Sequence, residues 1–207
     1  MNERLVQRLA RWRWVGVLVV LALVAGLLSV LIAGFPVGLY VIPSGSMERT
    51  LHGCDGCTDD WVLVDRTAYW FGDPRPGDVV VFVQPPSWRD PEAPTGAARR
   101  VELVKRVVAV GGQTVSCCDD HNRVVVDGRA IDEPYVYFLP EAGPANQSPF
   151  PEVHVPAHEL WVMGDSRNNS ADSRPPGRGP IPIDDVVGQV RWRVLPLLRF
   201  GPIEPSR

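Results

Sequence analysis

The hydropathy pattern divides the 207-residue chain into one long apolar run and a series of shorter apolar segments. Residues 15–35 contain no charged side chain and are rich in Val, Leu and Ala. A helix of this length extends about 30 Å, at about 1.5 Å per residue, and this matches the hydrocarbon core of a bilayer. The pattern therefore predicts a transmembrane helix at 15–35, preceded by a short segment at 1–14 and followed by a folded domain at 36–207.

The charges on either side of the apolar run predict its orientation. Four arginines and one glutamate precede the run, and the first charges after it are Glu48 and Arg49. Because positively charged flanks stay in the cytoplasm, we predict a single-pass type II protein of the plasma membrane with a cytoplasmic N-terminus and an extracytoplasmic domain. The alternative is a cleaved signal peptide, which usually has a shorter apolar region than this one.

The shorter apolar segments predict a mainly β domain. Apolar and alternating runs, bounded by turn residues, favour strands over any amphipathic helix. The dipeptide Asp127-Gly128 is typical of a hairpin turn. The strands are expected at 61–65, 79–83, 101–110, 123–126, 159–163 and 186–194. Two Pro-rich segments, 85–98 and 133–158, are expected to be loops, and the sequence assigns no role to either.

Composition narrows the possible functions. A net charge of −3 gives no basic footprint for nucleic acid, so no nucleic-acid partner is expected. Of the 21 basic residues, Lys105 is the single lysine and the others are arginine. A lysine amine can lose its proton at a usable pH, whereas a guanidinium cannot. The composition therefore draws attention to Lys105 as a candidate base.

Four cysteines follow the apolar run, where an oxidising compartment favours disulfides. They are Cys54, Cys57, Cys117 and Cys118. Three pairings are possible, and a bridge between adjacent cysteines would be strained. We therefore expect one or two disulfides that link the 54/57 loop to the 117/118 turn. A zinc site or a redox-active pair is the alternative, but neither the spacing nor the surrounding pattern favours it, and we expect no metal and no cofactor.

Three segments carry residues that could take part in catalysis. In the first, Ser44 and Ser46 flank a glycine in a stretch without strand or helix pattern. In the second, Lys105 shares the face of a predicted strand with apolar side chains. Burial on such a face favours the neutral amine, which can accept a proton from a serine hydroxyl. The third, 163–174, is a polar loop directly after an apolar strand.

Together these segments resemble the bacterial type I signal peptidase family, in which a Ser–Lys pair cleaves signal peptides. Four sequence boxes match in the family's order. They are Pro43–Leu51, Arg75–Phe82, Val104–Gly112 and Gly164–Arg174. The resemblance implies an extracytoplasmic antiparallel β domain of the signal-peptidase type. It also implies that the enzyme removes signal peptides from preproteins after small-x-small sequences.

The same resemblance implies a role for individual residues. Ser46 would be the nucleophile and Lys105 the general base, with the Ser44 hydroxyl and the Ser46 N–H as the oxyanion hole. Ser170 would orient the lysine amine, Asp172 and Arg174 would form a supporting ion pair, and Asp165 would be structural. Residues implied to line the substrate pockets are Tyr40, Ile42, Met47, Leu51 and Val104.

The chain departs from the family pattern at three positions. Arg49 stands where the family commonly has Pro, Ser166 where it has Asn, and Asn168 where it has Asp. None of the three has an implied catalytic role, although Arg49 follows the nucleophile closely enough to alter its turn.

Other functions are compatible with parts of the sequence. A Ser–His–Asp hydrolase would need one of the four histidines, but these lie in loop-like contexts, and the G-x-S-x-G motif is absent. An inactive paralogue, or a redox-sensitive tethered β domain that binds partners, would explain the anchor and the cysteines. The expected partners are signal peptides and the lipid bilayer, and the protein is expected to be monomeric or weakly associated.

Overall fold

The structure, a computed structural model, describes residues 16–17, 19–24, 26, 36–89 and 101–205. Its contacts divide the chain into two compact units, Met1–Pro36 and Val37–Arg207. The predicted segment 1–14, most of the predicted span at 15–35 and much of the Pro-rich loop at 85–98 lie outside the described residues. Within the described residues, no helix has the length and apolar character needed to cross a bilayer.

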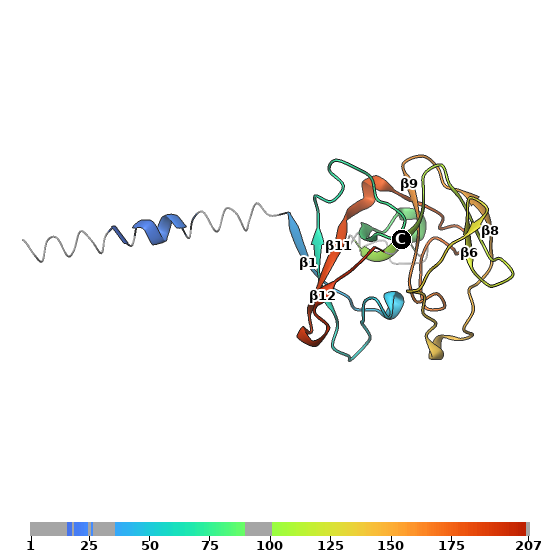
Figure 1. Ribbon diagram of the computed structural model, residues 1–207, viewed down its shortest axis with the longest axis horizontal. Helices are drawn as coiled ribbons and strands as arrows, with labels where there is room; N and C mark the ends of the chain where they lie inside the picture. The colour runs from blue at the N-terminus through green and yellow to red at the C-terminus, as the bar shows by residue number, and fades with distance from the viewer. Residues whose placement is uncertain (1–15, 18, 25, 27–35, 90–100, 206–207) are drawn as a thin grey trace, which may run out of the picture. The chain divides into compact units, whose positions relative to one another are not determined.

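The second unit is built mainly from antiparallel β-strands, which confirms the predicted mainly β domain (Figure 1). Its larger sheet has the strand order β1-β2-β11-β3-β4-β9-β10, and β12 pairs with β11. The bounds are β1 Val37–Val41, β2 Trp61–Asp65, β3 Val79–Val83, β4 Glu102–Val110, β9 Glu159–Met163, β10 Ile181–Pro182, β11 Val186–Leu195 and β12 Gly201–Pro202.

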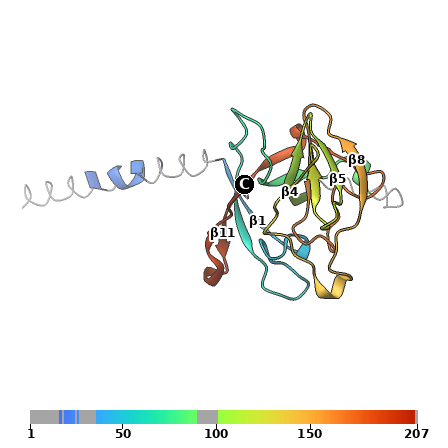
Figure 2. The same ribbon diagram turned by 45° about the vertical axis from the view of Figure 1, so that its right-hand side comes forward.

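A second sheet, with the order β7-β6-β5-β8, lies on the side of this unit away from β1 and β11 (Figures 1 and 2). Its strands are β5 Thr114–Cys117, β6 Val124–Val126, β7 Arg129–Ala130 and β8 Phe150–His154. The predicted hairpin is confirmed, because Asp127 and Gly128 have φ of 50° and 73° between β6 and β7. The prediction that 133–158 is entirely loop is wrong at β8. That strand tolerates Pro151 because it lies at the edge of its sheet.

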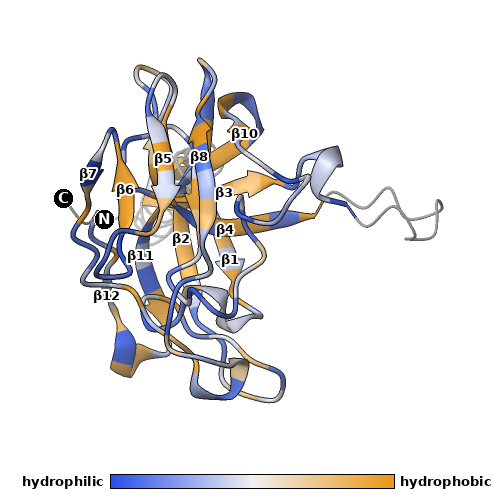
Figure 3. Ribbon diagram, turned by 90° about the vertical axis from the view of Figure 1, so that its right-hand side faces the viewer, coloured by the Kyte–Doolittle hydropathy of each residue, from blue (hydrophilic) through white to orange (hydrophobic). Residues whose placement is uncertain are grey.

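Strand β3 forms the centre of the larger sheet and is apolar throughout (Figure 3). Its residues from Val79 to Phe82 are buried on both faces, which explains why the sequence shows a continuous apolar run rather than alternation. One face packs against Ile42, Met47 and Leu51. Short 3-10 helices occupy the connections, namely η1 Gly45–Met47, η2 Pro86–Trp88, η3 Pro140–Ala142, η4 Ile183–Asp185 and η5 Leu197–Arg199.

The expected long-range disulfide is wrong. The bridges join Cys54 to Cys57 and Cys117 to Cys118, so each closes locally. Cys54 and Cys57 lie in a tight turn with their Cα atoms 5.4 Å apart, which is within the normal reach of a disulfide. The second pair lies at the end of β5 in the other sheet, so the two loops belong to different parts of the unit.

Candidate active site

Ser46 lies in η1, immediately after the chain leaves β1. The residues that follow it hold this turn against the core, because Met47 and Leu51 are 1% and 0% exposed. The Leu51 N–H also donates to the carbonyl of Met47 at 2.7 Å. Burial of these apolar side chains fixes the turn and leaves the Ser46 side chain half-buried at its surface.

Lys105 reaches the Ser46 hydroxyl from β4. Its amine donates hydrogen bonds to Ser46 Oγ at 2.8 Å and to the carbonyl oxygen of Val104 at 2.9 Å. The side chain lies opposite Val80 in the β3–β4 register and is only 3% exposed. The fold therefore brings together two groups that are 59 residues apart in the sequence.

The surroundings of Lys105 make its amine a usable base. Burial lowers its pKa to about 8, although the charges of Asp172 and Asp165 act in the opposite direction. With this pKa about one amine in ten is neutral at pH 7, compared with about one in a few thousand for an exposed lysine. The amine can therefore accept a proton from the hydroxyl that it contacts.

Ser44 lies beside the candidate nucleophile. Its Oγ is 3.4 Å from Ser46 Oγ, and its side chain makes no capping hydrogen bond to η1. An exposed hydroxyl in this position is available to donate to an oxygen that develops negative charge near Ser46. This arrangement suits the oxyanion-hole role that the sequence implies for Ser44.

A small cavity of about 110 Å³ opens next to the Ser46–Lys105 pair. Four of the five residues expected to contact substrate line it, namely Tyr40, Ile42, Met47 and Val104. The fifth, Leu51, does not line this cavity and is buried in the cluster beneath the turn. The lining of this hollow is mainly apolar, and it lies directly beside the Ser46 hydroxyl.

Asp165 supports the site from the other face of β4. Its carboxylate accepts hydrogen bonds at 2.8 Å and 2.6 Å from Arg106 and at 2.5 Å from the Thr50 hydroxyl. The backbone N–H of the next residue, Ser166, donates to the carbonyl of Ser46 at 3.1 Å. The polar loop is therefore attached to the nucleophile turn at two points.

The pair of Asp172 and Arg174 forms as the sequence implies, with two hydrogen bonds of 2.8 Å and 2.7 Å. Burial would raise the pKa of Asp172, but the hydrogen bonds and charge of Arg174 outweigh it and lower that pKa. The carboxylate also accepts the Gly164 N–H at 3.0 Å. Ser170 lies in the same loop. Among the described residues, no hydrogen bond joins Ser170 to Lys105, so the role of Ser170 in orienting the amine stays a prediction.

Sequence reasoning missed Arg106, Thr50 and the Tyr135 region. Tyr135 lies in the Pro-rich segment 133–158, and its ring packs under the guanidinium of Arg106 at 4.0 Å. Nearby, Arg167 forms a buried ion pair with Glu133 at 2.5 Å. In a chain with so many arginines, the only available signal was the position of Arg106 on a buried strand, facing away from Lys105.

Three residues of types that often bind metals lie together among the described residues, but two of them are joined in a disulfide. The ligand atoms of His52, Cys54 and Cys57 lie within 4.8 Å of one another. The two sulfurs are joined in a disulfide and so cannot act as thiolate ligands. His52 Nδ1 also lies 2.5 Å from the carboxylate of Glu48, as an ordinary loop contact.

A family model described as signal peptidase, peptidase S26, matches residues 11–195. The signal peptidase I of Mycobacterium tuberculosis is 40% identical over 215 residues, which cover 88% of this chain and 73% of that protein. A probable signal peptidase I of Mycobacterium leprae is 38% identical over 235 residues, with coverage of 94% and 80%.

More distant relatives are also similar. The signal peptidase I T of Bacillus subtilis is 31% identical over 177 residues, which cover 84% of this chain and 81% of that protein. Among solved structures, a signal peptidase I from Enterococcus faecalis aligns with a TM-score of 0.41 and 25% identity. That alignment covers 56% of this chain and 95% of the other.

Proposed function

The chain belongs to the signal peptidase, peptidase S26 family, and from this premise we propose that Ser46 and Lys105 carry out its catalysis. The protein is a serine peptidase that removes signal peptides from preproteins, as its relatives' names describe. The assignment of the two catalytic residues rests on one observation, the hydrogen bond of 2.8 Å between a buried amine and the Ser46 hydroxyl.

The proposed reaction is acyl transfer through a serine ester. The neutral Lys105 amine takes the proton of Ser46 Oγ as this oxygen attacks the scissile carbonyl carbon. The ammonium then protonates the leaving amine, which releases the mature chain and leaves the signal peptide esterified to Ser46. Lys105 next removes a proton from water, and the resulting attack frees the signal peptide and restores the hydroxyl.

Donors near Ser46 stabilise the tetrahedral intermediate in this proposal. The Ser44 hydroxyl is 3.4 Å from Ser46 Oγ, and the backbone N–H of Ser46 lies in the same turn. Removing one donor of this kind typically costs about 2.7–4 kcal/mol of transition-state stabilisation. Asp165, Asp172 and Arg174 position the loop that packs against this turn and do not touch the reacting atoms.

The small cavity supports the binding of an apolar side chain next to Ser46. It measures about 110 Å³ and has walls that include Ile42 and Val104. The preference for small-x-small sequences is implied by the resemblance and is part of the proposal.

We also propose that residues 15–35 anchor the protein in the plasma membrane with the second unit outside. The support is the uncharged apolar run and the arginines before it. Tethering keeps the catalytic unit close to membrane-bound substrates and raises their effective concentration.

A cleavage assay with a purified preprotein in detergent or liposomes tests the function. We expect the wild type to release the mature chain and Ser46→Ala and Lys105→Met each to lower kcat/KM by at least about 10³-fold. Lys105→Arg should be equally inactive, because it keeps the charge but cannot lose its proton. Ser87→Ala, at an exposed serine in η2, serves as the control.

Two outcomes would contradict the proposal. Cleavage that survives the loss of Ser46 or Lys105 would exclude the Ser–Lys pair and would reopen the histidine-based alternative. A wild-type protein that binds a preprotein without cleaving it would favour an inactive paralogue or a binding domain.

A further inference from the structure

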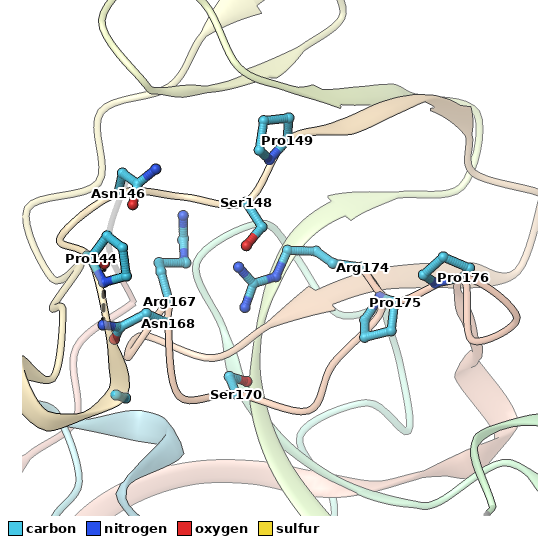
Figure 4. Close-up of a pocket in the computed structure, with 11 residues that line it drawn as sticks. Pro144, Asn146, Ser148, Pro149, Arg167, Asn168, Ser170, Arg174, Pro175 and Pro176 are labelled. Atoms are coloured by element: carbon cyan, nitrogen blue, oxygen red, sulfur yellow. Dashed lines mark hydrogen bonds between the residues drawn. The ribbon is translucent and has the colours of Figure 1, made fainter.

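A second, larger cavity lies beside the polar loop that contacts Ser46. It measures about 590 Å³, within the usual range for ligand sites. One wall comes from residues 142–149 of the Pro-rich segment, and the other from residues 167–176 (Figure 4). Four of the lining residues are prolines, so the walls have little conformational freedom to lose when a ligand binds.

The cavity begins next to the proposed nucleophile. Ser170 lines it, and the same loop donates the Ser166 N–H to the Ser46 carbonyl at 3.1 Å. Gly164 leaves no room for a Cβ between Ser170 and Ser46, so the loop and the nucleophile turn are in direct contact there. The larger cavity shares no lining residue with the small cavity that holds Ser46 and Lys105. The loop therefore separates two hollows, one with the catalytic pair and one without it.

The larger cavity presents guanidinium and other polar groups. Arg167 and Arg174 are among its lining residues, and the carboxylates that pair with them, Glu133 and Asp172, are not. Arg174 uses Nε and Nη2 to bind Asp172, and no hydrogen bond among the described residues uses its Nη1. Figure 4 shows the Arg174 guanidinium between the hydroxyls of Ser148 and Ser170. A ligand in this cavity meets guanidinium, hydroxyl and amide groups alongside the proline rings.

We propose that this cavity binds the first residues of the mature chain, on the far side of the scissile bond, and that it favours an acidic side chain among them. The inference rests on the proposed function, because it needs a peptide held with its scissile carbonyl at Ser46. In this proposal the small residue before the scissile bond occupies the small cavity. The residues after the bond then pass the Ser166–Ser170 loop and enter the larger cavity. A carboxylate there accepts hydrogen bonds from Arg174, while Ser148 and Asn146 contact the peptide backbone.

Cleavage of matched preproteins tests this subsite. The substrates share one signal peptide and differ by Asp, Asn or Lys at a single position among the first four residues of the mature chain. We expect kcat/KM for the best-placed Asp to exceed that for Asn by about two- to fivefold, the size of a partly exposed ion pair. Lys should be cleaved more slowly than Asn. Because the contact forms in the bound substrate, the difference should appear mainly in KM.

A charge added to the cavity wall provides the second measurement. Ser148→Asp should abolish or reverse the preference for Asp over Lys, because the new carboxylate repels an acidic side chain. Ser148→Asn keeps the side chain uncharged and should retain the preference. Ser87→Asp adds the same charge at an exposed serine that does not line the cavity, and should leave the preference unchanged.

The outcomes separate this inference from the proposed function. Equal kcat/KM for Asp, Asn and Lys at all four positions, with normal cleavage, would overturn the subsite and leave the function intact. An equal change in Ser148→Asp and Ser87→Asp would also overturn the subsite, because it would reduce the preference to long-range charge. Failure of the wild type to cleave any of these substrates would overturn both proposals.

Discussion

Strand β4 carries a lysine and an arginine at adjacent positions, and their side chains enter two differently built regions. Both residues are nearly fully buried, Lys105 at 3% and Arg106 at 2% exposed. Arg106 meets the carboxylate of Asp165 through two hydrogen bonds and donates a third to the carbonyl of Gly77. Among the described residues, the hydrogen-bond acceptors of the Lys105 amine are a hydroxyl and a carbonyl oxygen.

The difference between these two regions lies in contact with a carboxylate. A contacting counter-charge offsets part of the cost of burying a charge, and the Arg106 guanidinium has such a contact in Asp165. Desolvation lowers the pKa of Lys105 to about 8. The charges of Asp172 and Asp165 raise this pKa, but neither carboxylate forms a hydrogen bond to the amine among the described residues. Burial without a contacting carboxylate therefore makes the Lys105 amine a usable base, and an arginine could not respond in this way.

Removing the carboxylate that pairs with Arg106 should have the largest effect on the free energy of unfolding. Asp165→Asn leaves the guanidinium buried without a carboxylate, and we expect it to lower the free energy of unfolding by about 3–5 kcal/mol. Urea denaturation of the full chain in detergent measures this loss. Asp119→Asn breaks an exposed ion pair with Arg123 and should change stability little. Similar losses in the two variants would show that burial of Arg106 does not set the strength of this pair.

Much of the larger sheet was predictable from the sequence, because its central strands are continuous apolar runs. The strands at 61–65, 79–83 and 159–163 were predicted with the bounds that the structure has. Strand β8 escaped prediction, because an edge strand accepts prolines that read as loop residues in the sequence. The disulfides escaped it too, because their pairing depends on which loops the fold brings together.

The sequence predicted only those parts of the site that show a recognisable pattern within a short segment. A single lysine on an apolar strand stands out in the sequence, and so does a glycine between two serines. Arg106 does not stand out, because its role depends on Asp165, which lies 59 residues away. The larger cavity could not be predicted either, because its two walls come from separate loops that meet only in three dimensions.

The pH dependence of kcat/KM tests whether Lys105, unlike Arg106, acts as a base. Because the neutral amine is the reactive form, kcat/KM should rise about tenfold per pH unit below pH 8 and level off above it. Asp172 raises the pKa of Lys105, so Asp172→Asn should move the inflection to lower pH in whatever activity remains. Asp119→Asn is the control for a distant carboxylate. A profile without an inflection between pH 6 and about 9 would mean that Lys105 does not set the rate.

Replacing each cation by methionine isolates the cost of burying it. The folded-state pKa of Lys105 is about 8 and the unfolded value is about 10.4, so the unfolded chain binds more protons between these values. Stability of the wild type should therefore rise with pH across this window. Lys105→Met removes the cost of burying the ammonium, and at pH 7 it should raise the free energy of unfolding by about 1–2 kcal/mol. The rise of stability with pH should weaken in this variant.

Arg106→Met is the matched comparison, because it should destabilise the protein by leaving the Asp165 carboxylate buried without its partner. Equal losses in the two methionine variants would show that the lysine is held in its charged form by a contact comparable to that of Arg106. A gain for Lys105→Met together with loss of cleavage would show that the site maintains a base at the expense of stability.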